Sequence, residues 1–291
     1  TIGNIKIEYS TDNFGSDIKT IHSGYSGASP YPWTPLPTDL VNTELMKIRL
    51  SAPGNGQPLS DVSQNGSKVI GTISNVQPNP AIWYKGDAKK VTWTQKGNIP
   101  QIDIRYKIAA GDTYNKVIKL LDAGHNDGPN EYVITDVQTP DENSEDCWIQ
   151  VADHDNSDVK GATASAFAIR PKITVSKPDS TGVFKVGSNN ANAVVWSLNG
   201  TTKVSAVNIL YATNGAGGTF DKPIASNVDA TLGQYNWNGV LNNLSTNVYV
   251  RVLDKSGGTG NPNVYGTTTQ PCAIIGNIAV QGPIDNEDWI I

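Results

Sequence analysis

Apolar and polar residues alternate with a period of two in several short segments of the chain. Three of these segments end in tyrosine: IKIEY (Ile5 to Tyr9), IDIRY (Ile102 to Tyr106) and VNILY (Val207 to Tyr211). Alternation of this kind places one set of side chains on each face of a β-strand. We expect the apolar set to face a core, namely Ile5, Ile7 and Tyr9, then Ile102, Ile104 and Tyr106, then Val207, Ile209 and Tyr211.

A second strand pattern follows each of these segments. It reads IRL from Ile48 to Leu50, IQV from Ile149 to Val151 and VRV from Val250 to Val252. The first and last residue of each triplet are predicted to point inward, because they are two positions apart. An aromatic residue precedes each triplet, at Trp33, Tyr132 and Trp237.

Further motifs recur in the same order. An isoleucine stands five residues before a proline at Ile73, Ile173 and Ile278, and an aromatic residue follows at Trp83, Phe184 and Trp289. A strand ending in tryptophan, VTW or VVW, ends at Trp93 and Trp196. The tyrosine of the first pattern recurs after 97 and then 105 residues. A unit of about 100 residues with about seven short strands is typical of a two-sheet sandwich. The sequence therefore predicts an all-β chain of tandem immunoglobulin-like (fibronectin III-like) β-sandwich domains.

The order of these motifs resembles a known kind of repeat. The pattern I-x-V-x-x-P, aromatic, G, V-x-W, V-x-I-x-Y-S, Y-x-W, I-R-V-x-D resembles the tandem immunoglobulin-like repeats of large bacterial and archaeal surface proteins. Those repeats are similar to the domain of the fungal Ser/Thr-rich GPI-anchored family of cell-wall glucan synthesis. The resemblance implies a sandwich fold and a secreted or surface location. The last motif departs from the pattern, reading IRLSA and IQVAD in the first two units.

The repeats predict the domain boundaries. We expect an immunoglobulin-like domain at 1–71 that lacks its A and B strands, two such domains at 72–171 and 172–276, and the first strand of a further unit at 277–291. The linkers are very short, which predicts stiff coupling of neighbouring domains. Open sheet edges are rarely tolerated. We therefore expect neighbouring copies of the unit, in sequence or in space, to complete the ends head to tail. Covalent continuation is favoured, because no B strand is available for donation.

Composition narrows the class of protein. Gly (28) and Pro (17) are plentiful and charged residues make up 17%, which suits short strands joined by turns. A net charge of −5 with scattered basic residues argues against a nucleic-acid partner. No apolar run approaches the roughly 20 residues of a membrane span. The two cysteines, Cys147 and Cys272, fall in different predicted domains and are interpreted as small buried hydrophobes.

One tryptophan falls outside the repeat positions. Trp148 directly precedes the inward Ile149, so its side chain should point outward, as should the equivalent Tyr249. Leu210 is also predicted to face outward, near Tyr249. Exposed aromatic residues on this face could contact a neighbouring chain or a glycan, although single exposed apolar residues are ordinary. The other six tryptophans are interpreted as core or corner residues.

The segment DHDNSD gathers hard oxygen donors in one loop. Asp153, Asp155 and Asp158 could bind calcium, the only cofactor that the sequence suggests. The alternative is a solvated acidic turn, because the loop lacks the central glycine and distant glutamate of an EF-hand. The three histidines, His22, His125 and His154, lack the spacing of a zinc site and are interpreted as solvated loop residues.

No catalytic pattern is present in the sequence. Acidic pairs such as Asp141 and Glu142 are adjacent in polar loops, whereas acid–base catalysis needs two carboxyl groups held apart across a cleft. There is no Gly-x-Ser-x-Gly elbow, phosphate loop or dinucleotide fingerprint. Three triplets, at Asn65, Asn199 and Asn243, fit the N-glycosylation pattern and leave surface glycosylation open.

These observations favour a non-catalytic, extracellular structural array, such as a segment of a cell-surface stalk, fibre or adhesin. Its expected partners are neighbouring copies or repeats, with surface glycans as a further possibility. The alternative hypothesis is a carbohydrate-binding or accessory module of a secreted multidomain enzyme. A stalk repeats equivalent surfaces and needs no pocket, whereas a binding module should gather aromatic and polar groups on one unit.

Overall fold

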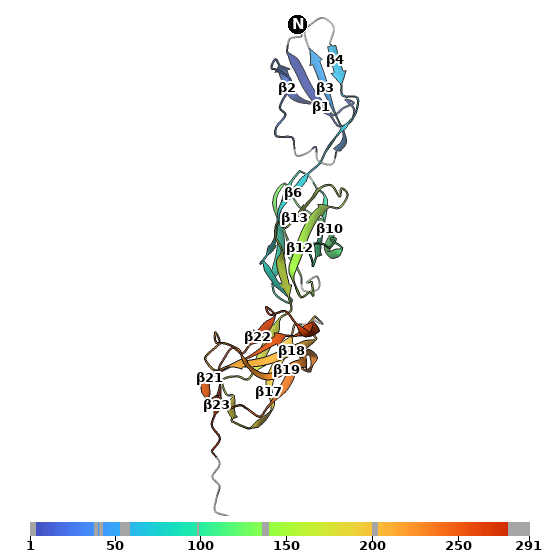
Figure 1. Ribbon diagram of the computed structural model, residues 1–291. Helices are drawn as coiled ribbons and strands as arrows, with labels where there is room; N and C mark the ends of the chain where they lie inside the picture. Colours follow the sequence, from blue (N-terminus) through green and yellow to red (C-terminus); the bar gives the residue numbers. More distant parts are fainter. Residues whose placement is uncertain are drawn as a thin grey trace, which may run out of the picture. The chain divides into compact units, whose positions relative to one another are not determined.

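A computed structural model of the chain describes residues 4–37, 40, 43–52, 59–97, 99–135, 140–199 and 203–278 (Figure 1). Within these residues the chain consists of β-strands, turns and short 3₁₀ segments, without an α-helix. The predicted all-β class is therefore confirmed. The described part of the chain holds no helix with the length and apolar character to span a membrane.

Contacts divide the chain into two compact units. One contains residues 1–82, 88–139 and 145–168, and the other contains residues 83–87, 140–144 and 169–291. The strands nevertheless follow the three-part repeat of the sequence. New strands begin at Thr72 and Ile173, and the predicted domain boundaries stay a prediction.

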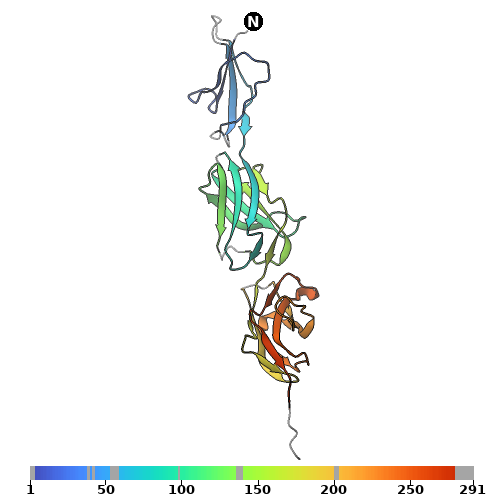
Figure 2. The same ribbon diagram turned by 90° about the vertical axis from the view of Figure 1, so that its left-hand side faces the viewer.

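The first repeat forms a single sheet among its described residues (Figure 1). Its strands are β1 (Ile5–Ser10), β2 (Lys19–Tyr25), β3 (Thr43–Ala52), β4 (Leu59–Val62) and β5 (Ser67–Val69). Their order is β2-β1-β3-β4, and β5 pairs with β3. Figure 2 shows the same strands from the side. A small core of Tyr9, Leu40, Met46 and Val69 is covered in part by Trp33.

The second repeat forms two sheets. Its strands are β6 (Thr72–Asn79), β7 (Ile82–Tyr84), β8 (Lys89–Lys96), β9 (Gln101–Lys107), β10 (Lys116–Ala123), β11 (Gly128–Ile134), β12 (Ser144–Asp153), β13 (Lys160–Ala162) and β14 (Phe167–Arg170). One sheet has the order β11-β8-β6. The other has the order β10-β9-β12-β14-β7, with β13 paired to β12.

The third repeat has the same topology. Its strands are β15 (Ile173–Lys177), β16 (Val183–Lys185), β17 (Asn189–Leu198), β18 (Ala206–Ala212), β19 (Lys222–Asp229), β20 (Gln234–Asn238), β21 (Ser245–Asp254), β22 (Tyr265–Thr267) and β23 (Cys272–Ile275), with 3₁₀ turns at Ala230–Leu232 and Ser256–Gly258. The sheets are β15-β17-β20 and β16-β23-β21-β18-β19, with β22 on β21. Two facing sheets of this kind make the immunoglobulin-like sandwich that the sequence predicted.

The predicted inward faces are correct in the second and third repeats. The inward residues of β9, β12, β18 and β21 are buried there. In the first repeat Ile7 and Tyr9 are buried, but Leu50 is 45% exposed, so its predicted inward burial is wrong. The physical reason is that no second sheet faces β3 among the described residues of this repeat.

Aromatic residues fill the cores. Trp83, Trp93 and Trp196 are buried, and the ring of Trp237 lies 4.9 Å from Phe184 and 5.0 Å from Tyr211, between ring centroids. The packing role predicted for these tryptophans is therefore observed. Trp289 and Pro283 lie outside the described residues.

Neither Cys147 nor Cys272 forms a disulfide bond, and both are buried. Burial raises the pKa of Cys272 to about 12, so its thiol stays protonated at neutral pH. This agrees with their interpretation as small hydrophobes.

A hydroxyl residue clamps the same strand in every repeat. In the third repeat the amide of Thr268 donates to the carbonyl of Val250 at 2.9 Å, and the amide of Val250 donates to Oγ1 of Thr268 at 3.1 Å. The same pair of bonds joins Ser63 to Ile48 in the first repeat and Thr163 to Ile149 in the second. These three hydroxyl residues mark equivalent positions, and the sequence analysis missed them.

Candidate functional site

The outward face of the β9–β12 and β18–β21 strand pairs carries the predicted contact residues. Trp148 lies on β12 between the buried Cys147 and Ile149, and is itself half-buried. Leu210 on β18 and Tyr249 on β21 are half-buried as well. These residues belong to two different repeats, so they are described separately.

The surroundings of Trp148 occupy much of its polar and aromatic surface. Its indole Nε1 donates to Oδ1 of Asp146 at 2.7 Å. Asp146 also accepts a hydrogen bond from the amide of Ala110, and these two bonds, that of Trp148 first, lower the pKa of the carboxyl group. The ammonium group of Lys107 lies 5.8 Å from the centroid of the Trp148 ring and 5.0 Å from that of Tyr114. Asp146 and Lys107 thus contact Trp148, so its ring is not a fully accessible surface for a ligand.

In the third repeat the strand register places Leu210 opposite Arg251, and Tyr249 opposite Ala212. Leu210 and Tyr249 are therefore diagonal neighbours, not a direct pair. Diagonal neighbours on one face remain within reach of long side chains. The residue that organises this face is Arg251, which sequence reasoning regarded only as one of several scattered basic residues.

Arg251 lies between two aromatic rings. Its guanidinium carbon is 3.8 Å from the ring centroid of Phe220 and 4.2 Å from that of Tyr265, and its Nε donates to Oγ1 of Thr267. Such stacking fixes the plane of the guanidinium group. Burial lowers the pKa of Arg251. In the sequence, Arg251 was marked only by its place in the VRV triplet. Its contacts with Phe220 and Tyr265 could not be predicted, because the sequence does not give the strand register or the loop path that brings these rings to it.

The first repeat also has a cation on the equivalent outward face of its sheet. Arg49 donates from Nε and Nη2 to Oε2 of Glu8, and its guanidinium carbon lies 4.4 Å from the ring centroid of Phe14. Lys6 also pairs with Glu8 at 2.6 Å. Hydrogen bonds from Lys6 and then Arg49 lower the pKa of Glu8 against the effect of burial. Each repeat therefore joins a cation to an aromatic ring on this face. The first and third repeats use an arginine and a phenylalanine, and the second uses Lys107 with Tyr114 and Trp148.

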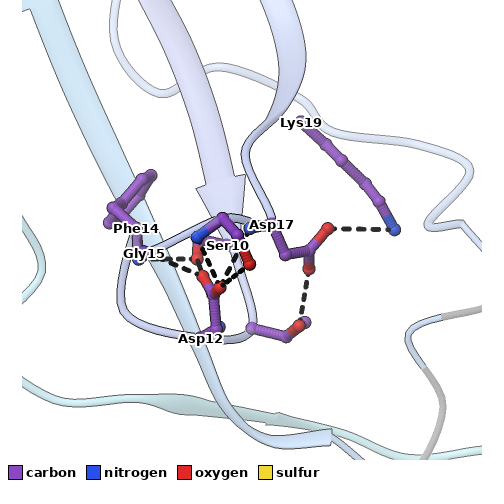
Figure 3. Close-up of polar contacts among 8 residues, drawn as sticks. Ser10, Asp12, Phe14, Gly15, Asp17 and Lys19 are labelled. Carbon is purple, nitrogen blue, oxygen red and sulfur yellow. Dashed lines mark hydrogen bonds and ion pairs between the residues drawn. The ribbon is translucent and has the colours of Figure 1, made fainter.

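The loop between β1 and β2 is organised around one carboxylate (Figure 3). Asp12 accepts hydrogen bonds from the amides of Gly15, Ser16 and Asp17 and from the hydroxyl of Ser10. These donors, led by the Ser16 amide, strongly lower the pKa of Asp12. Because donors surround the carboxylate, its role is to fix the loop.

Asp153 plays a comparable part in the loop proposed for calcium. It is buried, and its Oδ1 accepts the amide of Asp155 at 3.0 Å. The equivalent Asp254 of the third repeat accepts the amides of Ser256 and Asn261. Within the second compact unit, Asp254 also accepts the side-chain amide of Asn143 at 2.9 Å.

The other two predicted calcium ligands are exposed. The structure places Asp155 and Asp158 at the surface of the loop and does not gather them with Asp153. No group of three His, Cys, Asp or Glu residues suited to a metal ion occurs in the part of the chain described. The repeat position of Asp153 explains this carboxylate without an ion, and calcium binding stays a prediction.

The histidines correct one expectation. His125 was predicted to be a solvated loop residue, but its Nε2 lies 2.7 Å from Asp122 and its ring packs edge-on against Trp93 at 4.7 Å. His22 lies on β2, half-buried beside the rings of Tyr25 and Tyr31. His154 is exposed and contacts Asp103. The solvated loop interpretation is wrong for His125, because its loop folds back onto the core tryptophan, and for His22, because it lies half-buried on a strand.

The structure separates the three glycosylation triplets. The side-chain amide of Asn199 donates to the carbonyl of Lys85 within the second compact unit, and that of Asn243 donates to the hydroxyl of Tyr211. Asn65 lies exposed in the turn between β4 and β5. Asn65 is thus the triplet whose amide is best presented to solvent.

No protein-family model and no curated protein sequence matches the chain. Solved structures with a similar fold include the three N-terminal domains of the bacteriophage RB49 highly immunogenic outer capsid protein, at 10% identity and a TM-score of 0.30, covering 95% of this chain and 90% of that one. An I-band fragment of titin has 11% identity and a TM-score of 0.32, covering 94% and 88%.

A structure of a bacterial ice-binding adhesin has 13% identity and a TM-score of 0.23, covering 94% of this chain and 88% of that one. The chain is similar to these proteins in its tandem β-sandwich architecture. The likeness to the fungal GPI-anchored family is not supported.

Proposed function

We propose that the chain is a non-catalytic structural segment of an extracellular repeat array, such as a surface stalk, fibre or adhesin. The observation that carries this proposal is the hydroxyl clamp at Ser63, Thr163 and Thr268, which recurs with the same two hydrogen bonds in each repeat. The outward neighbours on the same strand differ, being Lys47, Trp148 and Tyr249. What recurs is the strand scaffold, together with a cation packed on an aromatic ring at its outward face.

The rival role, a carbohydrate-binding module, requires a platform of accessible aromatic rings and polar groups. Trp148 is the residue that favoured this role. Its Nε1 donates to Asp146, however, and the ammonium group of Lys107 lies over its ring. A row of repeated structural units therefore agrees better with these contacts than a single carbohydrate-binding face does.

Force spectroscopy on the full chain, attached through its two ends, tests the proposal. We expect separate unfolding events, each releasing on the order of 300 Å of chain for a repeat of about 100 residues. Smooth extension without discrete events would contradict a load-bearing role. Saturable binding to a polysaccharide that is lost in Trp148→Ala would favour the accessory module instead. Antibody labelling of intact source cells tests the extracellular location.

A further inference from the structure

The first sheet presents an apolar groove on the face that forms the core in the other repeats. Leu50 is 45% exposed and Leu59 is 59% exposed. Together with Ile5, Ala52 and Asp61 they line an open groove of about 310 Å³. Large exposed apolar residues grouped in this way mark a surface that is covered by something else.

The equivalent residues are buried in both other repeats. Strand pairing aligns Leu50 with Asp61 in the first repeat and Val151 with Gly161 in the second. The third repeat aligns Val252 with Gly266, and the hydroxyl clamp two residues further on gives the same alignment. The equivalents of Leu50 and Leu59 in the other two repeats are all buried: Val151, Val159, Val252 and Val264. The first repeat thus keeps core-type residues at positions that its own described strands leave open.

In the other repeats the first strand covers this place. β6 packs on β13 in the second repeat, and β15 packs on β21 and β22 in the third. A Cβ atom on Gly161 would collide with the carbonyl of Ile73, and one on Gly266 with the carbonyl of Ile173. The groove on β3 and β4 is therefore the position that a first strand takes in a complete sandwich.

The chain itself contains a segment of this kind. Ile278, Val280 and Pro283 have the spacing of Ile173, Val175 and Pro178 in β15, and Trp289 follows where Phe184 follows in β16. We propose that residues 277–291 of a second copy bind this groove and the neighbouring edge of the first sheet, joining copies head to tail. This inference deepens the proposed function and rests on its repeat architecture.

The register of the third repeat specifies how the edge is recognised. There β16 runs parallel to β23, with Phe184 opposite Ile274. Val69 on β5 is the equivalent of Ile274, because Thr43 pairs with Val69 as Ser245 pairs with Ile274. Trp289 of the second copy would therefore lie opposite Val69.

The residues beside this pair are apolar as well. In the same register Ile290 would face Ile70, which is 44% exposed. Among the described residues β5 pairs with β3 alone, whereas the equivalent β23 pairs with strands on both sides. Main-chain hydrogen bonds to an open sheet edge, combined with pockets for alternate side chains, are an established way of binding an extended segment.

Asp61 distinguishes this contact from the internal one. It carries a Cβ atom and a charge where the other repeats have glycine under the first strand. An incoming strand must therefore lie farther from β4 than β6 lies from β13. The contact is accordingly weaker than an internal strand and reversible between copies.

The test compares the association of full-length variants by sedimentation. The unmodified chain should form species larger than one chain of 31.1 kDa as its concentration rises. Leu50→Glu removes the groove and Trp289→Ala removes the incoming side chain, so each variant alone should remain monomeric. A mixture of the two should recover a one-to-one complex and nothing larger, because one partner keeps the groove and the other keeps the strand. Asp61→Gly should associate about tenfold more tightly, since it restores the residue of the other repeats.

Two controls separate this contact from other effects. Leu232→Glu places the same charge on an exposed leucine of the third repeat and should leave association unchanged. Trp289→Phe should retain association, because Phe184 occupies the equivalent position. An unmodified chain that stays monomeric throughout, or a Trp289→Ala chain that still self-associates, would overturn the inference. The second result would indicate two grooves packed face to face. Either result leaves the force-extension test of the proposed function unaffected.

Discussion

Thr268 and Val250 exchange two hydrogen bonds, one through the threonine amide and one through its hydroxyl. The hydroxyl takes the place of a backbone carbonyl, so it satisfies the buried amide of Val250 where the ladder between β21 and β22 ends. An unpaired buried amide is costly, and this pair removes that cost in the second and third repeats, where the bond is buried.

Replacing Thr268 with Val should therefore destabilise the third repeat. Valine keeps the shape but leaves the Val250 amide without its acceptor, and we expect a loss of about 1–3 kcal/mol in the free energy of unfolding, measured by urea denaturation. Thr268→Ser should remain close to the unmodified chain, because Ser63 forms the same bonds in the first repeat. A Val variant as stable as the Ser variant would show that the clamp contributes nothing.

Two tryptophans of the second repeat should respond in opposite ways to truncation. Trp93 is buried, and Trp93→Ala should cost about 3–5 kcal/mol through lost packing and the cavity left behind. Trp148→Ala should cost less than about 1 kcal/mol, since its side chain is half-buried at the surface. Denaturant titration of both variants measures the difference. Equal losses would mean that the two faces of this sandwich are wrongly assigned.

Many core residues of this chain could be predicted from its sequence, because every second residue of a half-buried strand faces the core. Tyr106 and Tyr211 were placed inward from alternation alone, and both are buried. Leu50 shows the limit of that argument. Alternation gives the face on which a side chain lies, but not whether a second sheet covers that face.

The surface contacts could not be predicted in the same way. Arg251 touches Phe220 and Tyr265, which lie 31 residues before it and 14 after it, and the contacts depend on strand register and loop path. The Ser63, Thr163 and Thr268 clamp did leave a signal, since the three hydroxyl residues recur with the unit length. It was missed because serine and threonine are common throughout this chain.

Calcium binding can be tested on the loop that begins at Asp153. Because the Asp153 carboxylate already accepts the Asp155 amide, we expect Asp153→Ala to lower the melting temperature to the same extent with calcium or with chelator present. Asp155→Asn should leave the melting temperature unchanged, since this side chain is exposed. A drop in melting temperature on chelation that disappears in Asp155→Asn would establish the calcium site instead.

Acid should weaken the first repeat through Glu8. Lys6 and Arg49 lower the pKa of this buried carboxyl group below its ordinary value of 4.5 in the folded chain. A pKa that is lower in the folded than in the unfolded state gives stability that is present above 4.5 and is lost as the pH falls through the folded-state value. Glu8→Gln should therefore be less stable than the unmodified chain at neutral pH, and its stability should change less between neutral pH and strongly acidic solution.

The control is Glu131→Gln, which removes a carboxylate from the exposed pair with Lys90. Urea titrations across this pH range measure the slopes, and a Glu8→Gln chain with the same acid sensitivity as the control would exclude Glu8 as the main titrating group.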